Sequence, residues 1–137
     1  MLLGFAGWTL LVLLAGVGAR RWELICRGDA ALTSFPADIP HGSDAYRRAV
    51  RAHANCLENL PVFGALVLIA AAAGLHSHDM DVLAVIVMAA RIAQTSIHVC
   101  FAERNATVAL RFAFFLLQVV AMVGIGAQIL TAAEPTN

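Results

Sequence analysis

Four long apolar stretches dominate the sequence and limit what it can fold into. A helix that crosses the hydrocarbon core of a bilayer needs about 20 mainly apolar residues. Stretches of about this length cover residues 2–19, 51–75, 82–101 and 106–133. Hydrophobic residues make up 61% of the chain and charged residues 13%, which is more apolar than soluble domains are. The sequence therefore predicts an all-α integral membrane protein, with one four-span domain over residues 1–137 arranged as a four-helix bundle.

The arginines between the spans predict how the chain crosses the membrane. No basic residue precedes the first apolar stretch, so it resembles a retained anchor more than a signal peptide. Neither terminus and no residue of the short connection at 76–81 is basic. Basic loops stay in the cytoplasm, so the first and third loops are expected there and both termini outside. The loop arginines are Arg20, Arg21, Arg27, Arg47, Arg48 and Arg104.

The connection between the first two spans is the only long one. Pro36, Pro40 and Gly42 argue against a continuous helix through its middle. Ser43 followed by Asp44 is typical of a helix start, with Ser43 as the N-cap and Asp44 in the first turn.

Charge and cysteine content exclude several kinds of partner. Nine basic residues balance nine acidic ones, so the chain lacks the basic field that nucleic-acid binding requires. Cys26, Cys56 and Cys100 are odd in number and lack CxxC spacing, which indicates neither a disulfide framework nor a zinc site. The segment "HSHDMD" at 76–81 contains metal-ligating residue types but is interpreted as a solvated turn, so no metal is expected.

Polar residues recur at helical spacing inside three of the four spans. A charged side chain at the centre of a span costs roughly 2.5–3.5 kcal/mol on insertion scales, so each one needs a partner or a purpose. Arginines outnumber glutamates, and Glu58 can neutralise only one of them. The spans are therefore expected to form a cavity of net positive charge that accepts a small anion. A lipid headgroup, or a structural ion-pair network between subunits, would also neutralise these arginines. The three stripes are Arg51, Asn55 and Glu58; Arg91, Gln94, Thr95 and His98; and Arg104, Arg111 and Gln118.

The segment "RRAVRAHANCLENLPVF" at 47–63 resembles the second-span signature of the MAPEG superfamily, the membrane-associated proteins in eicosanoid and glutathione metabolism. "ARIAQTSIH" at 90–98 and "LRFAFFLLQ" at 110–118 are similar to the signatures of the third and fourth spans. The combination resembles bacterial members related to microsomal glutathione transferases, which implies a bacterial inner membrane with both termini in the periplasm. The second-span pattern R-x-x-R-A-H-x-N-x-x-E-x-x-P is filled by Arg48, Arg51, Ala52, His53, Asn55, Glu58 and Pro61.

The resemblance implies an assembly and an activity. It implies a homotrimer in membrane lipid, with glutathione as co-substrate in a cytoplasm-facing cavity between protomers. It also implies glutathione transferase or glutathione peroxidase chemistry on lipophilic electrophiles. The resemblance implies Arg111 as the catalytic residue that stabilises the thiolate, and His98, which shares a helix face with Arg91, is a second catalytic candidate. The implied glutathione-binding residues are Arg21, which Arg20 could replace, together with Arg51, Asn55, Glu58 and Arg91. Gln94, on the same polar stripe as Arg91, is expected to join them.

The chemistry fits the residue types. A thiol with a pKa of about 8.5 is mostly protonated at neutral pH, and a nearby guanidinium favours the nucleophilic thiolate. His98 stands where eukaryotic members usually carry tyrosine, so it is a candidate acid, base or packing group. His53 is expected to form a hydrogen bond between helices instead.

Two other functions compete with catalysis. One is a non-catalytic membrane protein that uses the same polar stripes for trimer assembly or for binding lipid headgroups. The other is a transporter, which is disfavoured because four short spans show neither a pair of discontinuous helices nor an inverted repeat.

Overall fold

A computed structural model describes residues 1–36 and 41–133, which contain four long helical rods and no strand. Pro40, one of the expected helix breakers, lies outside the described residues. Each rod is long and apolar enough to cross a membrane, so the predicted all-helical, four-span fold is confirmed. The first rod joins α1 (Leu2–Leu11), the π-helical η1 (Val12–Gly18) and α2 (Ala19–Cys26); the others are α3 (Asp44–Ala72), α4 (His78–Cys100) and α5 (Asn105–Ala133).

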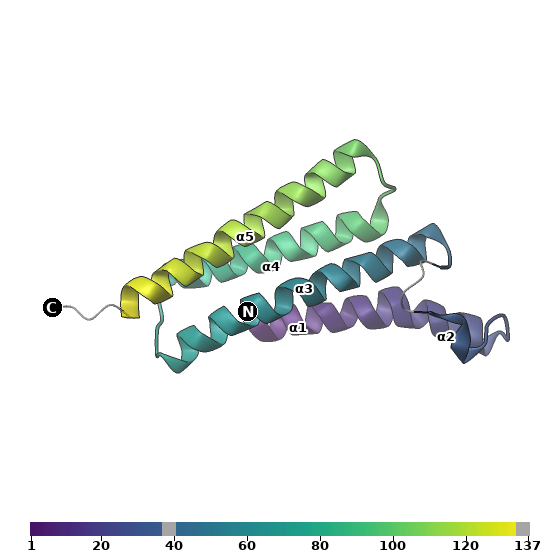
Figure 1. Ribbon diagram of the computed structural model, residues 1–137, viewed down its shortest axis with the longest axis horizontal. Coiled ribbons are helices and arrows are strands. Elements are labelled where there is room, and N and C mark those ends of the chain that lie inside the picture. Colours follow the sequence, from purple (N-terminus) through teal and green to yellow (C-terminus); the bar gives the residue numbers. More distant parts are fainter. Residues whose placement is uncertain (37–40, 134–137) are drawn as a thin grey trace.

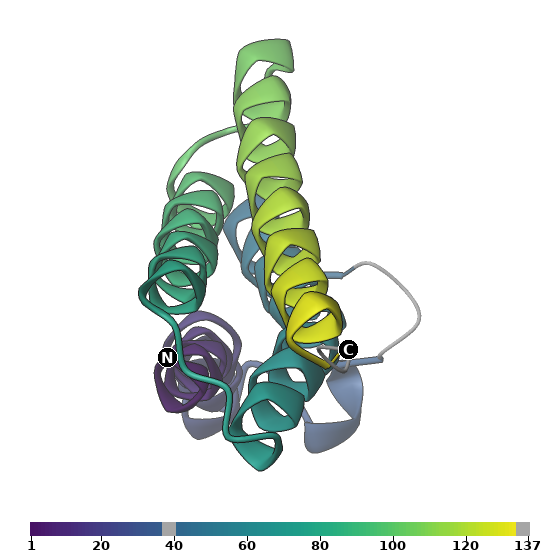
Figure 2. The same cartoon turned by 90° about the vertical axis from the view of Figure 1, so that its left-hand side faces the viewer.

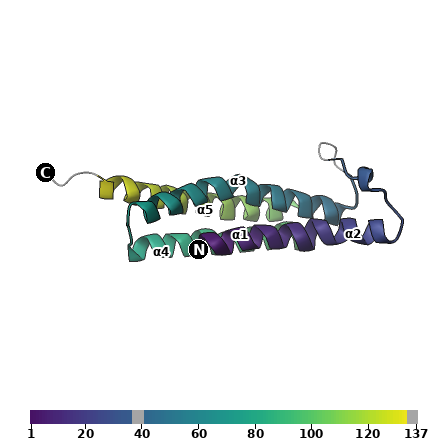
Figure 3. The ribbon, with the colours of Figure 1, turned by 90° about the horizontal axis from the view of Figure 1, so that it is seen from below.

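The four rods run along a common long axis (Figures 1 and 3). The first rod lies antiparallel to α3, and α4 forms an antiparallel hairpin with α5, the most extensively packed pair. The N-terminus, the C-terminal end of α5 and the 73–77 turn lie towards one end of the bundle. The opposite end, which we call the loop end, carries the first loop and the 101–104 loop. Towards the loop end α5 diverges from α3 (Figures 1 and 2).

An apolar core fills the half of the bundle away from the loop end. Phe5 and Phe63 are both fully buried and tilt against each other, with their ring centroids 5.4 Å apart. Side chains from α4 and α5 complete this core. On the outside, large apolar side chains such as Leu3, Leu68 and Val123 are exposed, as suits helices that face hydrocarbon.

A smaller apolar cluster at the loop end fixes the first rod against α3. Val17, Tyr46 and Ala49 are buried there. Gly16 lies so close that a Cβ atom added to it would be 3.3 Å from the Ala49 Cβ atom. The close approach of η1 to α3 therefore depends on small residues on both sides.

The helix ends agree with the sequence in one place and differ in two. Ser43 caps α3 as predicted, because its hydroxyl accepts a hydrogen bond from the Tyr46 amide at 3.3 Å. The first rod, expected to end near residue 19, continues to Cys26. The prediction that 76–81 is entirely a turn is wrong: α4 begins at His78, with the Ser77 hydroxyl accepting from the Met80 amide at 3.1 Å. Asp79 and Asp81 favour this start, since acidic groups are stabilised near a helix N-terminus.

Candidate functional site

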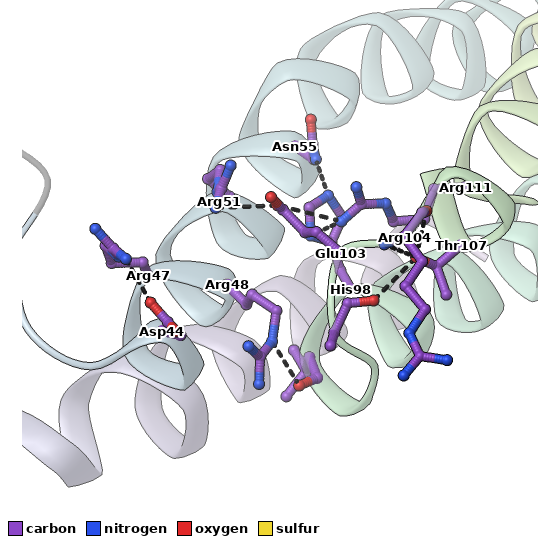
Figure 4. A network of polar contacts seen from close by, with 12 residues as sticks. Asp44, Arg47, Arg48, Arg51, Asn55, His98, Glu103, Arg104, Thr107 and Arg111 are labelled. Carbon is purple, nitrogen blue, oxygen red and sulfur yellow. Dashed lines mark hydrogen bonds and ion pairs between the residues drawn. The ribbon is translucent and has the colours of Figure 1, made fainter. Parts of the chain in front are cut away.

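The polar stripes of three helices meet at a single imidazole near the loop end. His98 lies in the last turn of α4 and is buried. Its Nε2 atom is 3.2 Å from the Asn55 amide nitrogen of α3, and its Nδ1 atom is 2.9 Å from Arg111 Nη1 of α5. Figure 4 shows these three side chains pointing toward one another. The ring thus connects one predicted binding residue to the predicted thiolate-stabilising arginine.

The contact with Arg111 determines where the proton of a neutral His98 ring resides. A guanidinium can only donate hydrogen bonds, so His98 Nδ1 must accept and Nε2 must carry the hydrogen. Nε2–H then requires an acceptor on Asn55. The side-chain amide oxygen of Asn55 provides it when the amide is flipped, so that its oxygen and nitrogen exchange positions. In that arrangement the Asn55 NH₂ group faces away from His98 and is available to a ligand.

Glu103 in the 101–104 loop brings two arginines together. Its Oε1 atom is 3.0 Å from Arg51 Nη2 and 3.8 Å from Arg111 Nη1 (Figure 4). The Arg51 side chain is 55% exposed, whereas that of Arg111 is only 12% exposed. Two guanidinium groups on different helices therefore converge on one carboxylate oxygen at the exposed side of the polar cluster.

A second group of polar side chains lies deeper between the helices. Arg91 is 1% exposed, donates from Nη1 to Gln94 Oε1 at 3.0 Å, and sits 5.5 Å from the Phe5 ring centroid. Gln94 donates to the Arg111 carbonyl at 3.1 Å and accepts a second hydrogen bond from Gln118, also at 3.1 Å. The Nε and Nη2 atoms of Arg91 have no hydrogen-bond partner among the described residues. This buried relay, made of Arg91, Gln94 and Gln118, connects α4 to the backbone of α5 beside Arg111.

The candidate residues from the sequence separate into groups. Arg51, Asn55, His98 and Arg111 form the cluster at the loop end, and Arg91 and Gln94 belong to the buried relay.

Two candidate residues stand apart from these groups. Glu58 is exposed and forms no ion pair with a described residue. Arg21, on α2, hydrogen-bonds to the Tyr46 hydroxyl and lies 5.2 Å from the centroid of the Phe35 ring. Within one protomer Arg21 is therefore held away from the cluster.

Glu103 is the member of the site that the sequence analysis missed. It lies in a loop, where no helical spacing marks it, and one of its two partners, Arg51, lies far away in the sequence. The available signal was its position as the one acidic residue between the third and fourth spans, beside Arg104.

Two further features bear on ligands. A cavity of about 200 Å³ lies between α2 and the start of α3, lined in part by Arg20, Phe35 and Tyr46, and it does not include the loop-end cluster. Over residues 1–36 and 41–133, no group of three or more His, Cys, Asp or Glu side chains is placed to hold a metal ion.

Four apolar helices with arginine, histidine and amide groups between them define an integral membrane protein with a polar site near one end of the bundle. The model of the MAPEG family matches residues 1–131, and the chain belongs to that family, which includes glutathione transferases and related membrane proteins. The resemblance seen in the second-span motif is thereby confirmed. No curated protein and no solved structure matches the chain.

Proposed function

We propose that the protein is a membrane-bound glutathione-dependent transferase or peroxidase that acts on lipophilic electrophiles. The observation that carries this proposal is the convergence of Arg51 and Arg111 on one point beside His98. Two guanidinium groups aimed at one position form a site for a small anion, and glutathione carries two carboxylates and an ionisable thiol. The full cavity would form between the subunits of a homotrimer, with the loop end in the cytoplasm.

Arg111 is the proposed catalytic residue. Its guanidinium lies in a largely buried place, where a positive charge stabilises a thiolate more strongly than it would in water. His98 accepts a hydrogen bond from Arg111 Nη1 and so orients the guanidinium. The other N–H groups of Arg111 remain available to the ligand. In this proposal His98 acts as the positioning residue in place of the tyrosine of other family members.

Each proposed binding residue contacts a different part of the glutathione tripeptide. Arg51 suits a carboxylate, and the Asn55 amide suits the peptide backbone. Glu58 is exposed and free of ion pairs with described residues, so it can accept the ammonium group. Arg21 would come from the neighbouring subunit, while Arg91 and Gln94 hold the wall of the site through the buried relay.

The proposed reaction is nucleophilic attack by the glutathione sulfur. With an alkylating or arylating substrate, a sulfur–carbon bond forms and the leaving group departs with the bonding electrons. With a hydroperoxide, the sulfur attacks the distal oxygen, the O–O bond breaks, and the alkoxide leaves with the bonding electrons and takes up a proton to become the alcohol. A second glutathione then attacks the resulting sulfenic acid, which gives glutathione disulfide and water. Exposed aromatic side chains on α5, Phe112 and Phe115, lie on the surface from which a membrane-dissolved substrate would approach.

A second candidate function rests on the buried relay. Arg91, Gln94 and Gln118 bond to one another and to the α5 backbone inside a single protomer. Such a network stabilises the packing of helices without any ligand, which favours a non-catalytic membrane protein whose polar groups serve assembly or headgroup binding.

Turnover by the purified protein distinguishes the two functions. We expect conjugation of glutathione to a lipophilic aryl halide, or reduction of an organic hydroperoxide, and a loss of about a hundredfold in Arg111→Ala. The matched control is Arg104→Ala, because Arg104 is exposed and forms no ion pair with a described residue. An inactive wild type, together with a lower unfolding temperature or a smaller assembly in Arg111→Ala, would support the structural function instead.

A further inference from the structure

We infer that Glu103 is a built-in counter-anion that occupies the ligand's place and sets the affinity of the site for anions. The inference rests on the proposed function, because it concerns the same arginines. Glu103 Oε1 lies 3.0 Å from Arg51 and 3.8 Å from Arg111, the positions at which a ligand carboxylate or thiolate would lie. A carboxylate and an anionic ligand cannot share these two guanidinium groups without strong repulsion.

The contacts of the Glu103 side chain are weak enough for a ligand to displace it. Its side chain is 42% exposed, and ion pairs of this exposure contribute little to stability. The distance of 3.8 Å to Arg111 is too long for a hydrogen bond, whereas His98 holds the same Nη1 atom at 2.9 Å. Arg111 therefore keeps its orientation through His98 when Glu103 turns away.

The backbone around Glu103 is held independently of its side chain. The Thr107 hydroxyl accepts from the Arg104 amide at 2.9 Å and lies 3.0 Å from the Ala102 carbonyl oxygen. These bonds fix the loop on both sides of Glu103, as Figure 4 shows for Thr107 and Arg104. The exchange therefore needs only rotation about the side-chain torsions of Glu103, which move among staggered rotamers.

An empty site and a filled site would then each hold an anion beside the two arginines. With no ligand, Glu103 neutralises guanidinium groups that would otherwise repel each other between the helices. With a ligand, the incoming anion replaces Glu103, and part of its binding free energy is spent on breaking the Glu103 pair. The affinity of the wild type is therefore lower than the two arginines alone would give.

The test compares Glu103→Gln with wild type in detergent, using glutathione and, separately, sulfate as probes. Glu103→Gln removes the charge and keeps the side-chain volume, and we expect it to bind glutathione about tenfold more tightly, the ratio that removal of one adjacent like charge gives. The matched control is Glu23→Gln, because Glu23 pairs with Arg27 at 2.8 Å on α2 and forms no ion pair with Arg51 or Arg111. Glu103→Asp keeps the charge and should bind as wild type does.

Each outcome separates this inference from the proposed function. If the wild type binds glutathione and Glu103→Gln binds equally or less tightly, or if Glu23→Gln gains as much, the inference about Glu103 is overturned and the proposed function stands. If no variant binds glutathione but sulfate raises the unfolding temperature of Glu103→Gln alone, Glu103 is the counter-anion and the proposed ligand is wrong. If no variant responds to either probe, both are overturned.

Discussion

Arg91 carries a full charge at 1% exposure, and its surroundings compensate this charge only in part. One N–H group donates to Gln94, and Cζ lies 5.5 Å from the centroid of the Phe5 ring. Two other nitrogen atoms have no hydrogen-bond partner in the part of the chain that the structure describes. Removing water from a charge is costly, and a favourable aromatic contact returns only a fraction of that cost. The stability of this part of the bundle therefore depends on the few partners that Arg91 has.

Gln94→Leu should be more destabilising than the small change in side-chain volume suggests. It removes the acceptor of Arg91 and the donor to the Arg111 carbonyl, so a buried charge loses its hydrogen bond to Gln94 at a cost of roughly 1.5–3 kcal/mol. The double variant Arg91→Met, Gln94→Leu removes that charge as well and should recover part of the loss. Thermal unfolding of the detergent-solubilised variants measures both effects, and strictly additive losses would contradict the account.

His98→Phe should reduce thiolate formation by about tenfold at an unchanged assembly size, because Arg111 loses the acceptor that orients it. His98→Gln should restore most of the loss, since its amide oxygen can accept from Arg111 while its NH₂ group faces Asn55. Ultraviolet absorbance of glutathione thiolate on the purified variants provides the measurement. Equal loss in both variants would indicate that the imidazole itself takes part in proton transfer.

Spacing along a helix explains which site residues the sequence could predict. Arg91, Gln94 and His98 share one helical face because residues three, four and seven apart do so in any helix, and the structure buries all three. Glu103 was not predictable in this way, because it lies in a loop and one of its ion pairs joins it to Arg51 on α3, which is distant in sequence. Glu58 was expected to neutralise an arginine, yet the ion pairs of Arg51 and Arg111 go to Glu103.

At the scale of the elements, α4 and α5 form the most closely packed pair, and Gly124 permits their approach. A Cβ atom on Gly124 would lie 3.1 Å from Leu83 Cδ1, which is closer than ordinary van der Waals contact. Small residues at such crossings are typical of helix packing in membranes.

Gly124→Val should therefore lower the stability of the bundle by about 1–3 kcal/mol, because the added atoms force Leu83 to move. Adding Leu83→Ala should relieve the overlap and raise the unfolding temperature above that of Gly124→Val alone. Gly7→Ala is the control: nothing lies within 4 Å of the added Cβ atom, so it should be neutral or stabilising. A tolerated Gly124→Val would show that α4 and α5 do not depend on this contact.

The number and type of helices could be predicted from the sequence, whereas the residues at which they begin and end could be predicted only in part. Apolar runs of about 20 residues define spans because hydrocarbon thickness sets their length. The first rod nevertheless continues through Arg20 and Arg21 to Cys26, since arginine is a good helix former and polarity alone does not end a helix. Ser43 was predictable as a cap because its side chain acts locally.

At the scale of the whole molecule, the arginines outside the spans gather at the loop end, as does the candidate site. We propose on this basis that the loop end faces the cytoplasm and that both termini lie outside.

Cysteine accessibility in intact cells checks this orientation. Cys26, at the end of α2, is exposed and should resist a membrane-impermeant thiol reagent until the cells are opened. In a variant without the native cysteines, His76→Cys should react from outside, because His76 is exposed in the turn at the other end. Labelling of Cys26 but not His76→Cys in intact cells would reverse the proposed orientation.

The central claim is that Arg111, held by His98, turns bound glutathione into its thiolate. The most direct measurement is a glutathione titration of the detergent-purified protein, following thiolate absorbance and the size of the assembly together. The account predicts a saturable thiolate signal in wild type that is lost in Arg111→Ala while the assembly remains intact. Absence of any signal at millimolar glutathione, or an equal signal in Arg111→Ala, would contradict it.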